Sequence, residues 1–155
     1  HVSIQECRVT DEGLRHLAGL ENLEHLHLRG ARIGDRGLEH LLGLKKLRNL
    51  NLPQSQVTDA GMKQLTQLPA LELLRIGSPH LTNESLQLIV MMPALRFLHL
   101  IDVPITDSGL DYLAGFSQLE SLYLDGTRIT DDGIEKLMEL LPKVHLLLFH
   151  IILNL

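Results

Sequence analysis

The feature that most constrains how this chain folds is an aliphatic pattern that repeats every 24 residues. Each repeat holds two aliphatic positions separated by one other residue, which is the alternation of a half-exposed strand. The second position recurs at steps of 24, and of 25 at the last step, as Ile4, Leu28, Leu52, Ile76, Leu100, Leu124 and Phe149. The first recurs as Val2, Leu26, Leu50, Leu74, Leu98, Leu122 and Leu147. We therefore expect seven strands.

A short helix is expected after each strand except the last. The strands are followed by one recurring phrase, as in "VTDAGM" and "ITDDGI", after which the apolar spacing lengthens to that of a helix. Thr stands at the expected N-cap, and the Asp that usually follows places negative charge at the positive end of the helix dipole. The predicted caps are Thr58, Thr82, Thr106 and Thr130. The Gly of the phrase is expected where neighbouring turns approach most closely.

Units of this length cannot each close a hydrophobic core, but stacked units bury one continuous column of Leu. The 37 Leu residues and the aromatic content of 3% fit such an aliphatic core. Strands joined by a helix in every turn are parallel, and right-handed crossovers are strongly preferred. We therefore predict an α/β fold, a right-handed solenoid with a concave parallel sheet of about seven strands and short helices on the convex side. Residues 1–155 form a single domain in this interpretation.

The repeat resembles that of the leucine-rich repeat family. The motif L-x-x-L-x-L appears in "LEHLHL" and "LESLYL", and T-x-I-T-D-x-G-L, as in "TRITDDGI", resembles a bacterial repeat class related to the cysteine-containing subclass. The strand-exit position, usually Asn or Cys in the family, reads Cys7, Ala31, Ser55, Pro79, Val103 and Thr127. A continuous Asn ladder is thus absent, and the loop carbonyls need other donors. The resemblance implies a scaffold that recognises another protein through its concave sheet.

The residues that alternate with the buried positions are expected to face solvent on the concave side. This face is expected to include Pro53 and Gly77 in the middle strands and Leu146 and Leu148 on the last strand. Aromatic and Arg side chains, which are enriched in binding hot spots, gather in the middle strands. The candidate partner-binding residues are His25, His27, Arg29, Asn49, Asn51, Leu73, Arg75, Phe97, His99, Ile101 and Tyr123.

Charge and hydropathy argue against two classes of partner. The formal net charge is −5 and the sequence has no basic stripe, which disfavours nucleic acid. The longest apolar runs, such as "HLLLFHIILNL", are too short and too interrupted to span a bilayer, so membrane insertion is not expected. The single cysteine, Cys7, cannot form an internal disulfide. This slightly favours the cytoplasm over an oxidising compartment and otherwise leaves the localisation open.

The sequence predicts no metal site. His25 and His27 would project from one face of a strand about 7 Å apart, which is a spacing that invites a metal hypothesis. His99, however, would lie three strands away from His27, roughly 14 Å, which is too far for shared coordination. A third ligand is therefore missing.

The sequence predicts no catalysis and no cofactor either. The residues His99, Ser121, Tyr123 and Asp125 on neighbouring strands are of types found in catalytic sites. A flat sheet, however, supplies no strained nucleophile turn, no evident oxyanion donors and no pocket that excludes water. We therefore predict that this segment is not an enzyme.

We interpret the chain as a protein–protein interaction scaffold whose partner docks on the concave sheet. Two alternatives stay open: the substrate-recruiting repeat domain of a ubiquitin-ligase receptor, which the resemblance implies, and a cell-surface module that binds glycans. Because the chain begins at His1 without Met, we expect it to be a segment of a longer protein. A fused F-box would favour intracellular recruitment, whereas a signal peptide or wall anchor would favour the surface role.

The ends of the stack generate a first prediction. No polar closing segment follows the last expected strand, which reads "LLLFHIILNL". An apolar edge strand without a cap is a template for pairing with another chain. We expect the chain to self-associate through its C-terminal strand, with an average mass that rises with concentration in sedimentation equilibrium. A monomeric mass at every concentration would contradict this expectation.

Overall fold

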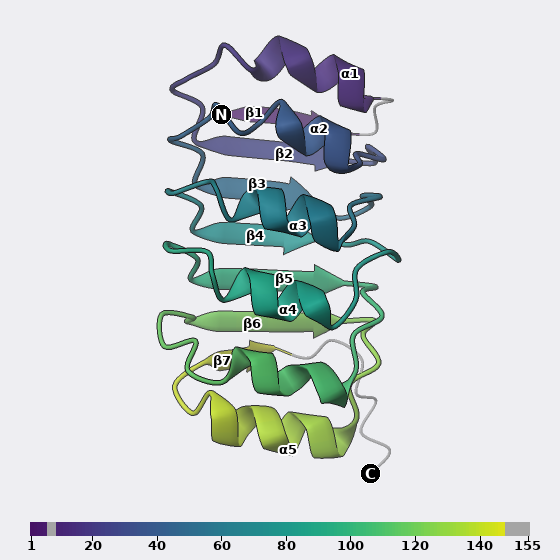
Figure 1. The fold of residues 1–155 in the computed structure, drawn as a ribbon, viewed down its shortest axis with the longest axis vertical. Helices are drawn as coiled ribbons and strands as arrows, with labels where there is room; N and C mark the ends of the chain where they lie inside the picture. The colour runs from purple at the N-terminus through teal and green to yellow at the C-terminus, as the bar shows by residue number, and fades with distance from the viewer. Residues whose placement is uncertain (6–8, 148–155) are drawn as a thin grey trace.

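The computed structural model describes residues 1–5 and 9–147, which form one parallel sheet of seven strands. The strands lie in sequence order, so that neighbours in the chain are neighbours in the sheet (Figure 1). They are β1 (Val2–Gln5), β2 (His25–Arg29), β3 (Asn49–Leu52), β4 (Leu73–Ile76), β5 (Phe97–Ile101), β6 (Ser121–Asp125) and β7 (His145–Leu147). The predicted parallel sheet is confirmed. The predictions for Cys7, Leu148 and Phe149 lie outside the described residues, as does most of the segment expected to self-associate.

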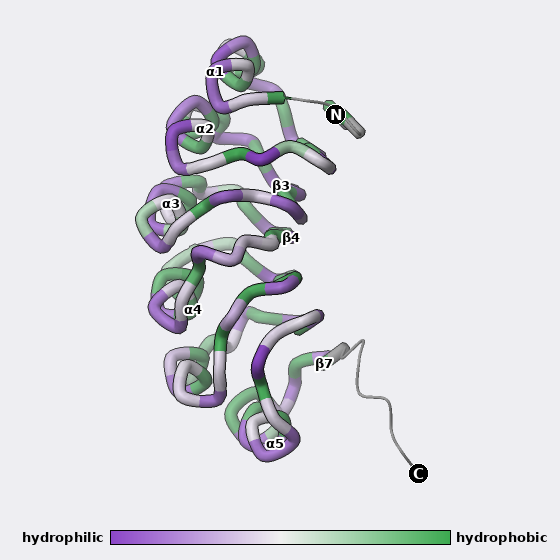
Figure 2. The backbone as a smooth tube through the Cα atoms, turned by 90° about the vertical axis from the view of Figure 1, so that its right-hand side faces the viewer, coloured by the Kyte–Doolittle hydropathy of each residue, from purple (hydrophilic) through white to green (hydrophobic). Residues whose placement is uncertain are grey.

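Short helices form a second layer over one face of the sheet. They are α1 (Asp11–Leu14), α2 (Asp35–Glu39), α3 (Asp59–Leu65), α4 (Glu84–Ile89) and α5 (Asp131–Leu140), with the 3₁₀ helices η1 (Arg15–Leu17) and η2 (Asp107–Leu113). Figure 2 shows the stack in profile, with the helices along the convex side and the strands along the concave side. In the part of the chain that the structure describes, no helix is long and apolar enough to cross a membrane.

The sheet keeps a register of 24 residues through every strand pair. On β7 the partner of Leu122 is Leu146, not Leu147. The expected last step of 25 is therefore wrong. Leu146 packs against the core, and His145 takes the outward position that had been assigned to Leu146. The physical reason is the run of Leu at 146–148, in which alternation of polar and apolar residues cannot define the register.

Inward-facing Leu residues from successive strands form the centre of the core. Five of them stand at equivalent positions and are 0% exposed: Leu26, Leu50, Leu74, Leu98 and Leu122. Burying each of these side chains contributes about 1.5–3 kcal/mol relative to leaving it in water. These Leu residues form a continuous column from turn to turn, so the stability of any one unit depends on its neighbours.

Two residues expected to be exposed on the concave face are buried. The strands β3 and β4 end at Leu52 and Ile76, so Pro53 and Gly77 follow the strands and are buried. A Cβ on Gly77 would stand 2.3 Å from the carbonyl oxygen of Pro53. The two turns approach here by backbone contact, which only Gly permits.

Serine hydroxyl groups bind loop carbonyls where the family's Asn ladder is missing. The Oγ of Ser55 donates to the carbonyl of Gly77 at 2.9 Å, and the Oγ of Ser78 donates to the carbonyl of Val57 at 2.7 Å. The buried strand-exit residue of the fourth unit is therefore Ser78, whereas Pro79, which had been assigned to this position, is exposed. In this unit the buried serine is thus the second residue after the strand, whereas Ser55 is the third residue after β3.

A series of side-chain hydrogen bonds joins the start of each helix to the start of the next. The carboxylate of Asp35 accepts from the backbone N–H of Thr58 at 2.9 Å and from its hydroxyl at 2.7 Å. Equivalent contacts join Asp11 to Gly34, Asp59 to Thr82, Asn83 to Thr106 and Asp107 to Thr130. We call this series the Asp–Thr ladder. The bonds from Thr130 hold the pKa of Asp107 below its ordinary value. The acidic side chain thus joins two turns, a role beyond the predicted interaction with the helix dipole.

Two of the four predicted threonine caps, Thr58 and Thr130, are N-caps whose side chains bind the helix start. The Oγ1 of Thr58 accepts from the N–H of Ala60 at 3.2 Å, and that of Thr130 accepts from Gly133 at 3.3 Å. Thr82 accepts from the N–H of Glu84 at 3.2 Å, but the N-cap of α4 is Asn83, so the predicted cap is wrong by one residue. Thr106 makes no such bond, and it is followed by the 3₁₀ helix η2.

The Gly of the recurring phrase makes room for the ladder. A Cβ on Gly61 would stand 2.2 Å from Oδ1 of Asp35, and one on Gly133 would stand 2.1 Å from Oδ1 of Asp107. The predicted close approach of neighbouring turns is confirmed at these positions. Its cause is the carboxylate, which lies over the helix start of the next turn.

The ladder generates a second prediction. Asp35→Ala removes two hydrogen bonds to a charged group between turns, and we expect it to lower the free energy of unfolding by about 2 kcal/mol or more. The measurement is urea unfolding of the purified variant.

Asp131 supplies the matched control, because it occupies the same place in the phrase of the sixth unit. It lies in the first turn of α5 and has no ladder partner within residues 1–5 and 9–147. Asp131→Ala should cost at most about 1 kcal/mol, since only the interaction with the helix dipole is lost. Equal losses for the two variants would show that the ladder bonds contribute nothing beyond that interaction.

Candidate functional site

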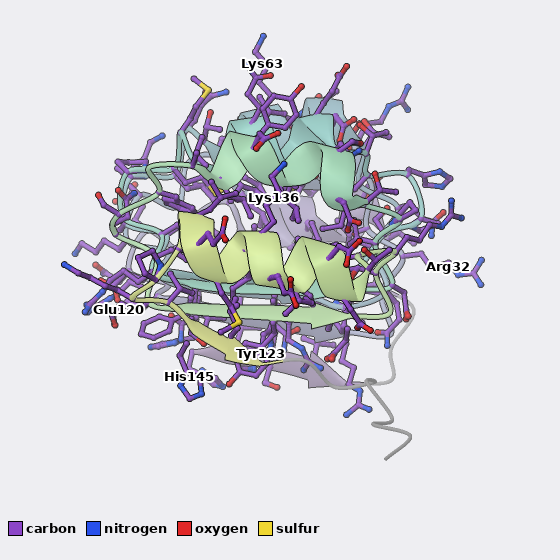
Figure 3. All side chains as sticks on the ribbon, turned by 90° about the horizontal axis from the view of Figure 1, so that it is seen from below. Arg32, Lys63, Glu120, Tyr123, Lys136 and His145 are labelled. Carbon is purple, nitrogen blue, oxygen red and sulfur yellow. The ribbon has the colours of Figure 1, made fainter. Side chains whose placement is uncertain are left out.

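The candidate residues lie in rows across the exposed face of the sheet. In-register pairing forms a first row through His25, Asn49, Leu73, Phe97, Ser121 and His145. A second row runs through His27, Asn51, Arg75, His99 and Tyr123. Arg29 at the end of β2 is exposed, and Ile101 pairs with Asp125 at the ends of β5 and β6. Figure 3 shows Tyr123 and His145 projecting from the face of the sheet opposite Lys63 and Lys136 on the helices.

The second row carries polar atoms that are buried and unpaired. Asn51 Oδ1, Arg75 Nε and His99 Nε2 have no hydrogen-bond partner among the described residues, and Asp125 Oδ1 shares this property at the end of β6. Leaving such an atom unsatisfied costs about 1–3 kcal/mol. Atoms of this kind are the ones that a bound molecule or an ordered water satisfies. Their grouping on adjacent strands makes this part of the face the candidate surface for binding polar groups.

His99 stands between Arg75 and Tyr123 in the second row, with Tyr123 against its ring. The two rings meet edge to face at an interplanar angle of 83°. Burial of the imidazole and the positive charge of Arg75 lower the pKa of His99, whereas the carboxylate of Asp125 acts in the opposite direction. The lowered pKa favours the neutral imidazole, whose Nε2 donates or accepts a hydrogen bond according to the tautomer.

A hollow of about 440 Å³ opens beside this row. Its walls are Leu73, Phe97, His99, Glu120, Ser121, Tyr123 and His145. Arg96 forms an ion pair with Glu120, and its Cζ lies 5.8 Å from the centre of the Phe97 ring. This arrangement neutralises Glu120 and positions the aromatic ring. The hollow thus combines apolar surface from Leu73 and Phe97 with polar groups from neighbouring strands.

The remaining candidates lie toward the first strands. The ring of His1 stands 5.7 Å from that of His25 and 5.2 Å from that of His27, centre to centre. Among the described residues, no group of three or more His, Cys, Asp or Glu side chains could hold a metal ion. Asn49 is half-buried on β3. The structure therefore brings Leu73, Phe97, His99 and Tyr123 together at the hollow and leaves the histidines of β2 outside it.

Sequence reasoning left Glu120, Ser121 and His145 out of the candidate list. Ser121 stands in the first row, so alternation alone was enough to find it. His145 was missed because the last strand had been placed one residue out of register. Glu120 precedes β6, and only its ion pair with Arg96 in the preceding unit shows that it lies at the rim.

Comparison with known proteins supports a leucine-rich repeat fold. A family model described as "Leucine Rich repeat" matches residues 19–42 and 118–138. An internalin from Listeria monocytogenes superposes with a TM-score of 0.69 at 23% identity, covering 90% of this chain and 38% of that one. A leucine-rich repeat protein from Leptospira interrogans gives 0.60 at 20% identity, covering 84% and 38%. Internalin C2 from Listeria monocytogenes gives 0.51 at 21% identity, covering 95% and 79%.

These likenesses concern the architecture. The chain spans 38% of the length of each of the first two proteins, so it corresponds to a part of them. No curated protein matches its sequence. The fold is therefore shown by the sheet, the helices and the superpositions together.

The electrostatics of the second row generate a third prediction. Arg75→Gln removes the positive charge that opposes protonation of His99, so the pKa of His99 should rise toward its ordinary value. Asp125→Asn removes the carboxylate that favours the imidazolium, so the same pKa should fall further. The measurement is a pH titration of the imidazole followed by NMR. Lys63→Gln, on the helix face, should leave the titration unchanged. Shifts of the opposite sign in either row variant would contradict this account of the site.

Proposed function

We propose that this leucine-rich repeat protein binds another protein on its concave sheet, with the centre of the interface at Arg75, Phe97, His99 and Tyr123. Leucine-rich repeat domains are typically protein-interaction modules and are generally non-catalytic. The observation that carries the proposal is a hollow lined by His99, which also belongs to a row of unpaired polar atoms on adjacent strands.

The chemistry of this surface fits an anchored protein interface. Hot spots combine an apolar or aromatic anchor with hydrogen bonds that are shielded from water. Phe97 and Leu73 provide the apolar wall, while Arg75 and His99 provide the unpaired polar atoms beside it. His25, His27, Arg29, Asn49, Asn51 and Ile101 surround this centre on the same face and extend the proposed interface along the sheet.

The test is loss of binding on truncation of the aromatic centre. We expect a Phe97→Ala, Tyr123→Ala double variant to bind its partner at least about thirtyfold more weakly than the parent, because central residues of an interface typically contribute 2 kcal/mol or more. Partners are captured from a lysate of the source organism, identified, and then titrated in purified form against each variant.

Lys63→Glu on α3 is the control for a substitution outside the proposed interface, since Lys63 is exposed and points away from the sheet (Figure 3). All variants must first melt at the same temperature as the parent. If the double variant keeps its partner and Lys63→Glu loses it, the wrong face has been assigned. The glycan-binding alternative would be favoured if no protein partner is captured, and if the parent binds a purified polysaccharide that the double variant does not bind.

A further inference from the structure

The arginines of the middle units differ in whether the fold already neutralises them. Arg48 is paired with Glu72 at 2.8 Å, and Arg96 is paired with Glu120. Arg75 makes no ion pair among the described residues, and its Nε is buried without an acceptor. Burying this nitrogen without an acceptor costs free energy. A carboxylate or another acceptor on a bound partner would offset that cost.

Asp125 shows the complementary property on the far side of His99. It stands at the end of β6, its Oδ1 is buried, and no donor reaches that atom within residues 1–5 and 9–147. The ion pairs of the described residues do not include it. Among the described residues, Arg75 and Asp125 are thus an unpaired cation and an unpaired anion on either side of His99.

We propose that the partner presents a bipolar linear segment, in which a carboxylate side chain pairs with Arg75, a cationic side chain pairs with Asp125, and a large apolar side chain fills the hollow beside Phe97. This inference rests on the proposed function and specifies the chemistry of the partner. Charge complementarity selects such a segment, because a segment of one charge would meet a like charge at one of the two positions.

The sheet geometry sets the spacing of the segment. Arg75 on β4 and Asp125 on β6 are two strands apart and two positions apart along the strand direction. With strands about 4.8 Å apart and a rise of about 3.3 Å per residue, their Cα atoms are separated by about 12 Å. An extended segment covers that distance in three to four residues. The acidic and the basic residue of the partner should therefore stand about three or four positions apart.

The experiment is selection from a random-sequence linear peptide display library on the immobilised 1–155 chain. Parent protein should enrich peptides with Asp or Glu and Lys or Arg at this spacing, together with a large apolar residue. Selection on Arg75→Gln should lose the acidic preference and keep the basic one, and selection on Asp125→Asn should do the reverse. Arg36→Gln is the matched control, because Arg36 is an exposed arginine on α2, in the helix layer and outside the proposed interface. It should enrich the same peptides as the parent.

A selected peptide then gives the quantitative test. Replacing its acidic residue by the neutral amide should weaken binding to the parent about tenfold or more and leave binding to Arg75→Gln unchanged. Peptides that require Phe97 and Tyr123 but show no charge preference would overturn this inference and leave the proposed function intact. Peptides whose binding survives the Phe97→Ala, Tyr123→Ala double variant would overturn both. Selection that enriches no peptide would overturn the bipolar segment alone.

Discussion

The constant step of 24 residues between turns is the constraint on which the rest of the structure depends. It places each inward Leu beside its equivalent in the next turn, so that hydrophobic burial continues from unit to unit. The same step places Asp35 within hydrogen-bond reach of Thr58. It also requires Gly at position 61, because the carboxylate of Asp35 leaves no room there for a Cβ. Packing, the Asp–Thr ladder and the Gly pattern are three consequences of one spacing.

The candidate site follows from the same regularity. Because the strands pair in register, outward side chains from successive turns stand in rows. The type of side chain can differ from strand to strand along a row while the backbone stays the same. Arg75, His99 and Tyr123 are consecutive members of one such row, and Phe97 stands in the next. The fold contributes rigid placement of these groups, while the identity of each outward residue is free to specify a partner.

The sequence predicted the number of strands, their parallel order, the convex helices and most of the outward face, since period and alternation depend on backbone geometry alone. It failed at the last strand and at the turn after β4. The run of Leu at 146–148 placed β7 one residue out of register, and a strict step of 24 put Pro79 in the buried position that Ser78 occupies. It also assigned the Asp residues to helix dipoles, because a contact between turns cannot be inferred within one unit.

The sequence by itself determined the solenoid, because a period that switches from two residues to about 3.6 within each unit has few other structural solutions. Only the tertiary structure decided which side chains of the concave face are already satisfied. Arg96 and Arg75 are equally basic in the sequence, but Glu120 pairs with the first and no described residue pairs with the second. That difference arises from neighbours contributed by other turns, since pairing and desolvation depend on distances in space.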